Sequence, residues 1–163
     1  MTVTLKTILD TVIAPALADL PPKMTSDAAK RMLLAIGLQE SGFATVRQYG
    51  NGPASGYWQF ERGGGVNGVL NHPASAELAK KAAERYGVTP DKQHVWLALG
   101  EQDKQILAAT FARLLLYTDP HALPVTVKDG WDCYLRNWRP GKPHPDKWPA
   151  CWTAASKELG LLP

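Results

Sequence analysis

Residues 26–43 read SDAAKRMLLAIGLQESGF, and this stretch indicates how the chain folds. Ser26 is a typical helix-capping residue, and apolar residues recur after it at three- and four-residue steps. Gly42 can end the helix, because glycine readily adopts the left-handed conformation found just past helix ends. The stretch therefore predicts an amphipathic helix from Ala28 to Glu40, with the Glu40 carboxyl at its C-terminal end.

Helical spacing recurs on both sides of this stretch. Upstream, residues 4–20 carry an amphipathic pattern that Pro15 disturbs, and we expect an N-terminal helix packed on the core. Thr89 is expected to cap a later helix whose first residue is Pro90. We expect further helices at residues 74–86, 90–100, 103–117, 126–138 and 150–159.

The segment 43–68 has a different character, because it is rich in glycine and aromatic residues. Its glycines, including the run at 63–65, make a continuous helix implausible, and a short β-hairpin is expected near residues 54–61. No repeat and no linker divides the chain. We therefore predict one mainly α-helical domain spanning residues 1–163.

Composition restricts the classes of function. The 163 residues are 45% hydrophobic and 20% charged, which is typical of a folded domain. A net charge of +3 is too small to indicate a nucleic-acid partner. No apolar run approaches the ~20 residues of a membrane span, and the N-terminus lacks the parts of a secretory signal. We expect a monomer that is made in the cytoplasm and does not insert into membranes.

Metal-dependent and nucleophilic chemistries lack their minimum motifs. The four histidines show no ligand spacing, and Cys133 and Cys151 are too few for a zinc site. Ser55 is displaced by one position from the serine of a GxSxG elbow, and no phosphate-binding loop is present. We therefore expect neither metal nor cofactor. The two cysteines are either buried free thiols or a pair formed in an oxidising space.

Glu40 has the properties of a catalytic acid. Met32, Ile36 and Glu40 lie four residues apart, so the carboxyl continues an apolar stripe that faces the interior. The negative pole of the helix and burial both raise the pKa of such a carboxyl. Cleavage of a glycosidic bond needs an acid that stays protonated near neutral pH. Taken alone, however, Glu40 is more simply explained as a solvated residue at a helix end.

Two motifs resemble those of the soluble lytic transglycosylases and goose-type lysozymes. Residues 39–43 (QESGF) resemble that family's Glu-Ser-Gly at a helix end, and residues 55–60 (SGYWQF) resemble its Gly-Leu-Met-Gln segment. The resemblance implies a lysozyme-like helical domain with a central cleft, Glu40 as catalytic acid/base and Ser41 as a residue that orients it. It also implies a substrate-lining segment made of Gly56, Tyr57, Trp58 and Gln59.

Other parts of the resemblance are less similar. Tyr57 and Trp58 stand where the family has an aliphatic pair, and either enlarge a sugar-stacking wall or change subsite preference. Gln105 stands in place of the asparagine of the family's Asn-Ile-x-Ala-Gly helix and is expected to bind substrate. Tyr134 is open between contact with substrate and a place in the core. Further candidates for the groove edge or for contacts with peptide stems and acetamido groups are Arg47, Tyr49, Arg139, Lys142 and His144.

The number of catalytic carboxylates distinguishes the possible reactions. A lysozyme uses a second carboxylate, whereas a lytic transglycosylase needs one acid because the muramic C6 hydroxyl replaces water. Glu61 is the best candidate for a second acid, since it directly follows the second motif. The resemblance implies cleavage of the β-1,4 bond between N-acetylmuramic acid and N-acetylglucosamine in peptidoglycan strands, by a phage endolysin or virion-associated lysin. Two alternatives stay open: an inverting muramidase similar to family-19 chitinases, and a non-catalytic glycan-binding virion protein.

Overall fold

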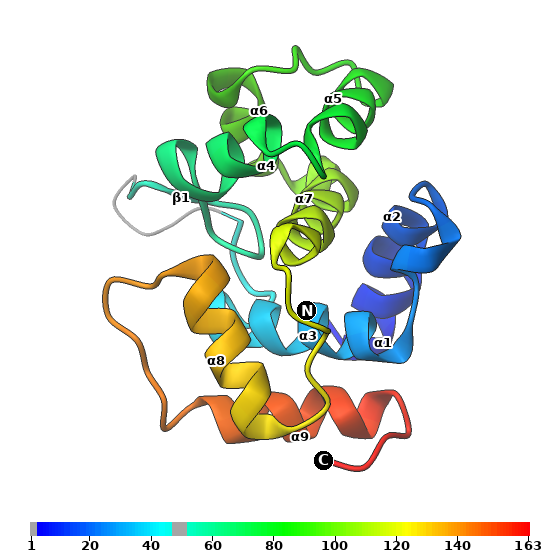
Figure 1. Ribbon diagram of the computed structural model, residues 1–163, viewed down its shortest axis with the longest axis vertical. Coiled ribbons are helices and arrows are strands. Elements are labelled where there is room, and N and C mark those ends of the chain that lie inside the picture. Colours follow the sequence, from blue (N-terminus) through cyan, green and yellow to red (C-terminus); the bar gives the residue numbers. More distant parts are fainter. Residues whose placement is uncertain (1–2, 47–51) are drawn as a thin grey trace.

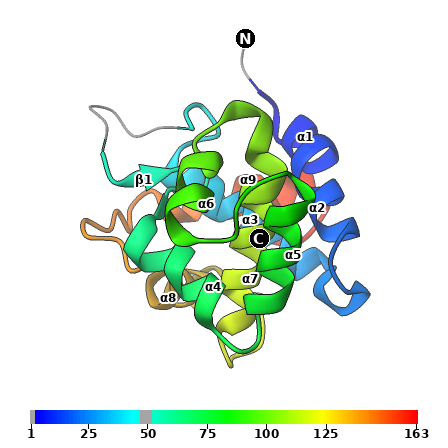
Figure 2. The ribbon, with the colours of Figure 1, turned by 90° about the horizontal axis from the view of Figure 1, so that it is seen from above.

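Helix α7 (Gln105–Thr118) runs through the middle of the molecule, and most of its side chains are buried. The computed structural model describes residues 3–46 and 52–163. Helices α4, α5 and α6 lie above α7 in the view of Figure 1, and α3 crosses below it. Seen from above, the same three helices cover α7 (Figure 2). The other helices in chain order are α1 (Leu5–Ile8), α2 (Ala14–Ala18), α3 (Asp27–Glu40), α4 (Asn67–Asn71), α5 (Ala76–Arg85), α6 (Lys92–Leu99), α8 (Val127–Trp138) and α9 (Trp148–Glu158).

The prediction of a mainly helical chain with one short hairpin is confirmed. Strand β1 (Ala54–Ser55) pairs antiparallel with β2 (Phe60–Glu61), and Ser55 lies opposite Phe60. Short helical turns connect several helices: η1 (Leu9–Ile13) and η3 (Arg62–Val66) are π-helical, and η2 (Pro22–Met24) and η4 (Gln102–Lys104) are 3-10. Buried side chains from α1 to α9 and from η1, η2 and η3 form a continuous core.

Helix α3 begins and ends at residues whose chemistry explains both boundaries. The Ser26 hydroxyl accepts a hydrogen bond from the Ala29 amide at 3.1 Å. Gly42 follows the helix with φ at +65°, and its amide donates to the Gly37 carbonyl at 3.0 Å. Phe43 then folds back, and its ring packs directly against Gly37. A Cβ added at Gly37 would lie 2.1 Å from this ring, so only glycine leaves room for it. Helix α9 packs along α3, so the Glu40 end of α3 is held from two sides (Figure 1).

Two expected helices differ from the structure near prolines. The N-terminal helix over residues 4–20 is divided into α1, η1 and α2, because Pro15 has no amide hydrogen and its ring displaces the preceding turn. Of these segments, η1 and α2 pack against α7, and α1 packs against η1 and α9. Thr89 does not cap α6. Asp91 does, because its carboxylate accepts from the His94 amide at 2.8 Å, and Pro90 precedes the helix.

The loop between α7 and α8 is held by the buried carboxylate of Asp119, whose side chain is 5% exposed. Its Oδ2 accepts from Arg136 Nη2 at 3.0 Å and from Asn137 Nδ2 at 2.7 Å, and its Oδ1 accepts from the His121 amide at 3.0 Å. Burial alone would raise the pKa of Asp119, but these donors together hold it well below its usual range. Asp119 thereby fastens the start of this loop to the last turns of α8.

We expect Asp119→Asn to lower the free energy of unfolding by about 2 kcal/mol at pH 7, because the Arg136 guanidinium loses its buried partner. A carboxylate with a depressed folded-state pKa stabilises the fold above its unfolded pKa, and this contribution is lost as the pH falls. The difference between wild type and variant in urea denaturation should therefore shrink from about pH 5 toward pH 2. Asp103→Asn, at an 80% exposed side chain, is the control and should change stability by less than about 0.5 kcal/mol.

Cys133 and Cys151 are both buried free thiols, which agrees with the first of the two alternatives. Burial raises the pKa of the Cys133 thiol to about 11, so this thiol stays protonated at neutral pH. Over the described ranges, no helix has both the length and the apolar character needed to cross a membrane.

Candidate active site

A cavity of about 920 Å³ lies between two groups of elements. Residues of β2, η3 and α4 form one wall, and α8 with the loop that follows it forms the other. Glu40, at the end of α3, lies between the two walls. Figure 1 shows α8 and its following loop on one side and the β1–α4 segment on the other. The cavity therefore contains the residue that the sequence predicts as the acid.

Glu40 also lines a second cavity of about 520 Å³, on the side of α9. Lys147, Ala150 and Cys151 contribute to this second cavity, which is mainly apolar. Glu40 therefore borders both cavities.

The environment of Glu40 favours its protonated form. Burial raises the pKa of Glu40 above its ordinary value, and the negative charge of Glu61 raises it further. A hydrogen bond from Tyr134 and the positive charge of Lys147 oppose this, and burial is the largest of these effects. The Tyr134 hydroxyl donates to Glu40 Oε1 at 2.7 Å and so sets the orientation of the carboxyl. Glu40 is therefore a positioned carboxylic acid with a raised pKa.

Tyr134 is a core residue that also belongs to the lining of the larger cavity. Its side chain is only 3% exposed, yet it borders the larger cavity. Its ring stacks on Trp148, with centroids 5.5 Å apart and planes at 13°, and lies 5.4 Å from the Trp131 ring. These contacts immobilise the phenol, so its hydroxyl holds Glu40 in a fixed place.

Ser41 contacts the second motif instead of Glu40. Its hydroxyl donates to the Tyr57 carbonyl at 2.6 Å and accepts from the Phe43 amide at 3.1 Å. Ser41 thereby ties the end of α3 to the segment that begins at Gly56. Its expected role in orienting Glu40 is at most indirect, through the position of this segment.

Gly56 and Gln105 have structural roles. Gly56 has φ at +81°, and a Cβ there would lie 2.8 Å from the Leu99 carbonyl oxygen. Gln105 is buried: its Oε1 accepts from the Tyr57 amide at 2.9 Å, and its Nε2 donates to the carbonyls of Leu99 and Glu101. All its polar atoms are thus satisfied within the protein. The expectation that Gln105 binds substrate is corrected, because it instead fixes the Gly56–Tyr57 backbone.

The aromatic pair of the second motif faces the core. Trp58 is 0% exposed, and its indole N–H donates to the Leu33 carbonyl of α3 at 2.8 Å. Tyr57 is buried against Phe43, and its hydroxyl accepts from Gln102 Nε2 at 2.7 Å. Neither residue lines the larger cavity. The expected sugar-stacking wall at these positions is corrected, since both rings are enclosed by the elements they hold together.

Gln59 and Glu61 do line the larger cavity, as predicted. Gln59 has φ at +52°, a conformation held by a hydrogen bond from its Nε2 to the Gly56 carbonyl at 2.8 Å. Glu61, in β2, is exposed, and its charge acts on Glu40 across the cavity. Gln59 and Phe60 of the second motif, together with Glu61 just after it, are therefore the residues between 55 and 61 that line the cavity.

Several residues that line the larger cavity were not predicted from the sequence to be site residues. Trp138 is half-buried on the cavity wall, and its indole N–H donates to the Trp58 carbonyl at 2.9 Å. Trp138 is thus an aromatic residue in the lining of the larger cavity, whereas Trp58 is not. The glycine run at 63–65 lines the opposite wall, and this run is the sequence feature from which that wall could have been predicted. Arg139, Lys142 and His144 also line the cavity, whereas Arg47 and Tyr49 lie outside the described residues.

In the part of the chain that the structure describes, no group of three His, Cys, Asp or Glu side chains is arranged to hold a metal ion. Comparisons of the chain with protein-family models, with curated proteins and with solved structures found no match. The site is thus characterised by its own geometry: a carboxyl with a raised pKa, fixed by a buried phenol, in a large cavity of a mainly helical protein.

Proposed function

We propose that this protein cleaves the β-1,4 bond between N-acetylmuramic acid and N-acetylglucosamine in peptidoglycan, with Glu40 as the proton donor. The observation that carries the proposal is the placement of Glu40, whose carboxyl has a raised pKa, in the lining of both cavities. The larger volume, about 920 Å³, falls in the upper part of the range of ligand sites. The partner is a peptidoglycan strand, and we infer a phage endolysin or virion-associated lysin as the biological setting.

The reaction follows from the position of Glu40. Its carboxyl donates its proton to the bridging oxygen, the bond from that oxygen to the anomeric carbon breaks, and positive charge develops on the sugar ring. The resulting carboxylate keeps its hydrogen bond from Tyr134, which stabilises it after proton transfer. Where the muramic C6 hydroxyl is the attacking group, the Glu40 carboxylate accepts the proton of that hydroxyl as the new bond to the anomeric carbon forms. Trp138 offers an indole face on the cavity wall for the apolar side of a sugar.

The attacking hydroxyl belongs either to the muramic C6 or to water. With Glu40 acting alone, attack by the C6 hydroxyl completes a transglycosylation without a second acid. Glu61 favours the second candidate, hydrolysis, because it is an exposed carboxylate on the same cavity as Glu40. In that reaction Glu61 accepts the proton of the water.

Mass spectrometry of a digest of purified peptidoglycan tests the proposal and separates these two reactions. Transglycosylation leaves 1,6-anhydromuramic ends, whereas hydrolysis leaves reducing muramic ends. Glu61→Gln should abolish only the hydrolytic product. If wild-type protein releases neither kind of fragment from intact walls, the proposed function is wrong.

We expect Tyr134→Phe to shift the pH dependence of cleavage. Glu40 acts in its protonated form, so activity falls as the pH rises through the pKa of Glu40. The Tyr134 hydroxyl lowers this pKa, so its removal should move the alkaline limb of kcat/KM to higher pH. Measuring kcat/KM on soluble glycan fragments from pH 4 to about 9 checks this. Tyr86→Phe, at a phenol outside both cavities, is the control and should leave the limb in place.

A further inference from the structure

The two walls of the larger cavity differ in charge. On the α8 side the charged residues are basic: Arg136, Arg139 and Lys142, with His144 beside them. On the opposite wall the charged residue is the acidic Glu61. The rest of that wall contains no Lys, Arg, Asp or Glu and is made of Ala54, Gln59, Phe60, Gly63, Gly64, Gly65, Asn67, Gly68 and His72. A ligand in this cavity therefore meets a cationic surface on one side only.

Two of these cations are available to a ligand. Arg136 is committed to Asp119, with its Nη2 3.0 Å from the carboxylate. Arg139 and Lys142 are exposed, and neither has a carboxylate partner within residues 3–46 and 52–163. Arg139 has φ at +47° and ends α8, where its amide donates to the Leu135 carbonyl at 3.2 Å. The segment at the end of α8 thus gives the cavity wall two exposed positive charges that no described carboxylate pairs with.

We propose that Arg139 and Lys142 bind the carboxylates of the peptide stems carried by the glycan strand. The protein would then act on peptide-bearing strands in preference to bare ones. This inference rests on the proposed function and specifies its substrate. Guanidinium groups bind carboxylates with two parallel hydrogen bonds, and ammonium groups bind them as point charges. Glu61 supports the same orientation, because it repels carboxylates from the other wall.

Cleavage of matched substrates tests the preference. One substrate is soluble glycan strands that keep their peptide stems, and the other is the same strands stripped by an amidase. The wild type should cleave the stem-bearing strands about tenfold faster at low substrate concentration, which corresponds to about 1.4 kcal/mol. In the double variant Arg139→Gln/Lys142→Gln the ratio of the two rates should fall to near one. The preference should also weaken as salt rises from about 0.05 M to about 0.5 M, because the cations are exposed.

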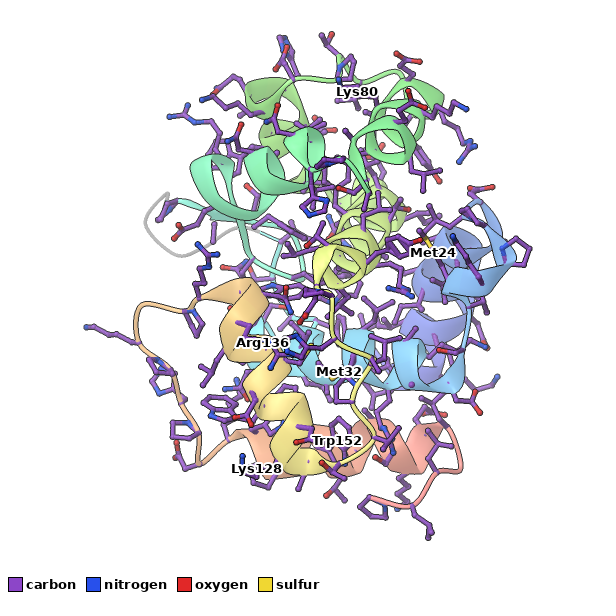
Figure 3. The ribbon with its side chains drawn as sticks, viewed as in Figure 1. Met24, Met32, Lys80, Lys128, Arg136 and Trp152 are labelled. Atoms are coloured by element: carbon purple, nitrogen blue, oxygen red, sulfur yellow. The ribbon has the colours of Figure 1, made fainter. Side chains whose placement is uncertain are left out.

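A second double variant controls for net charge. Lys80→Gln/Lys81→Gln removes the same charge from the exposed face of α5, and neither residue lines the cavity. Figure 3 shows Lys80 at the far end of the molecule from Arg136 on α8. This control should keep the wild-type preference. An equal loss in both double variants would show a long-range charge effect and would overturn the assignment to Arg139 and Lys142.

A binding measurement makes this inference separable from the proposed function. Glu40→Gln protein is mixed with each kind of strand, and binding is measured by sedimentation. About tenfold tighter binding to stem-bearing strands supports the inference even if the wild type cleaves neither substrate, which would contradict only the proposed function. Equal binding and equal cleavage of the two substrates overturn the inference and leave the proposed function intact. Binding that instead requires strands carrying wall teichoic acid assigns the two cations to phosphate and also overturns it.

Discussion

Glu40→Gln is expected to lower the rate of glycan cleavage by about 10³-fold or more, with little change in stability. A positioned general acid contributes roughly 10²–10⁴-fold to such a reaction, and the amide of glutamine cannot donate its proton to the bridging oxygen. The substitution keeps the size of the side chain. The Tyr134 hydroxyl still finds an oxygen acceptor, at the place where it now donates to Glu40 Oε1 at 2.7 Å. Turbidity loss of purified cell walls and release of soluble fragments measure the effect.

The matched control for this prediction is Glu84→Gln. It makes the same chemical change at an exposed residue of α5 that lines neither cavity. Its cleavage rate and its free energy of unfolding should match those of the wild type. Cleavage at the wild-type rate by Glu40→Gln would remove Glu40 from the reaction. Wild-type protein that sediments with walls without releasing fragments would favour the glycan-binding alternative.

Trp58→Ala is expected to lower the free energy of unfolding by about 3–5 kcal/mol. The indole is 0% exposed and lies among Phe43, Tyr57 and the core face of α3. Its removal leaves a large cavity and removes the hydrogen bond from the indole N–H to the Leu33 carbonyl. Trp58→Phe keeps most of the ring volume and loses the hydrogen bond, so a loss of about 1–2 kcal/mol is expected. Urea denaturation followed by circular dichroism measures both values.

Trp58→Phe also tests where the indole lies. An indole in the core and an indole that stacks on a sugar lead to different expected effects on stability and on glycan binding. If the ring belongs to the core, the variant loses stability but binds glycan fragments with unchanged affinity once folded. The matched variant Trp138→Phe changes an indole on the cavity wall and should weaken glycan binding by several-fold. A loss of binding by Trp58→Phe without any loss of stability would contradict the core placement.

Part of the candidate site could be predicted from local sequence, because its determinants are local. The Ser26 cap and the Gly42 terminus define α3 through hydrogen bonds and backbone conformations within a few residues. The Glu40 carboxyl therefore falls at a helix end in any fold of this chain. The hairpin near residues 54–61 is also local, since the four residues 56–59 turn between the two short strands.

Other roles depend on contacts between distant residues, and the motif alone assigned them wrongly. Trp58 and Gln105 occupy positions that the resemblance gave to substrate. Each is satisfied within the protein, by α3 and by the Gly56–Tyr57 backbone respectively. A buried tryptophan and a sugar-stacking tryptophan look the same in one sequence. The difference lies in which surface packs over the ring, and no local pattern contains that information.

The hydrogen bond between Tyr134 and Glu40 shows most directly what local sequence determines and what tertiary contacts determine. The residues near α3 place an acid at a helix end, but they do not determine whether water or protein surrounds that acid. The two residues are 94 positions apart, and packing of α8 and α9 against the end of α3 brings the phenol to 2.7 Å from the carboxyl. Helix formation depends on short-range bonds, whereas burial and the resulting rise in the pKa of Glu40 depend on which helices pack over it.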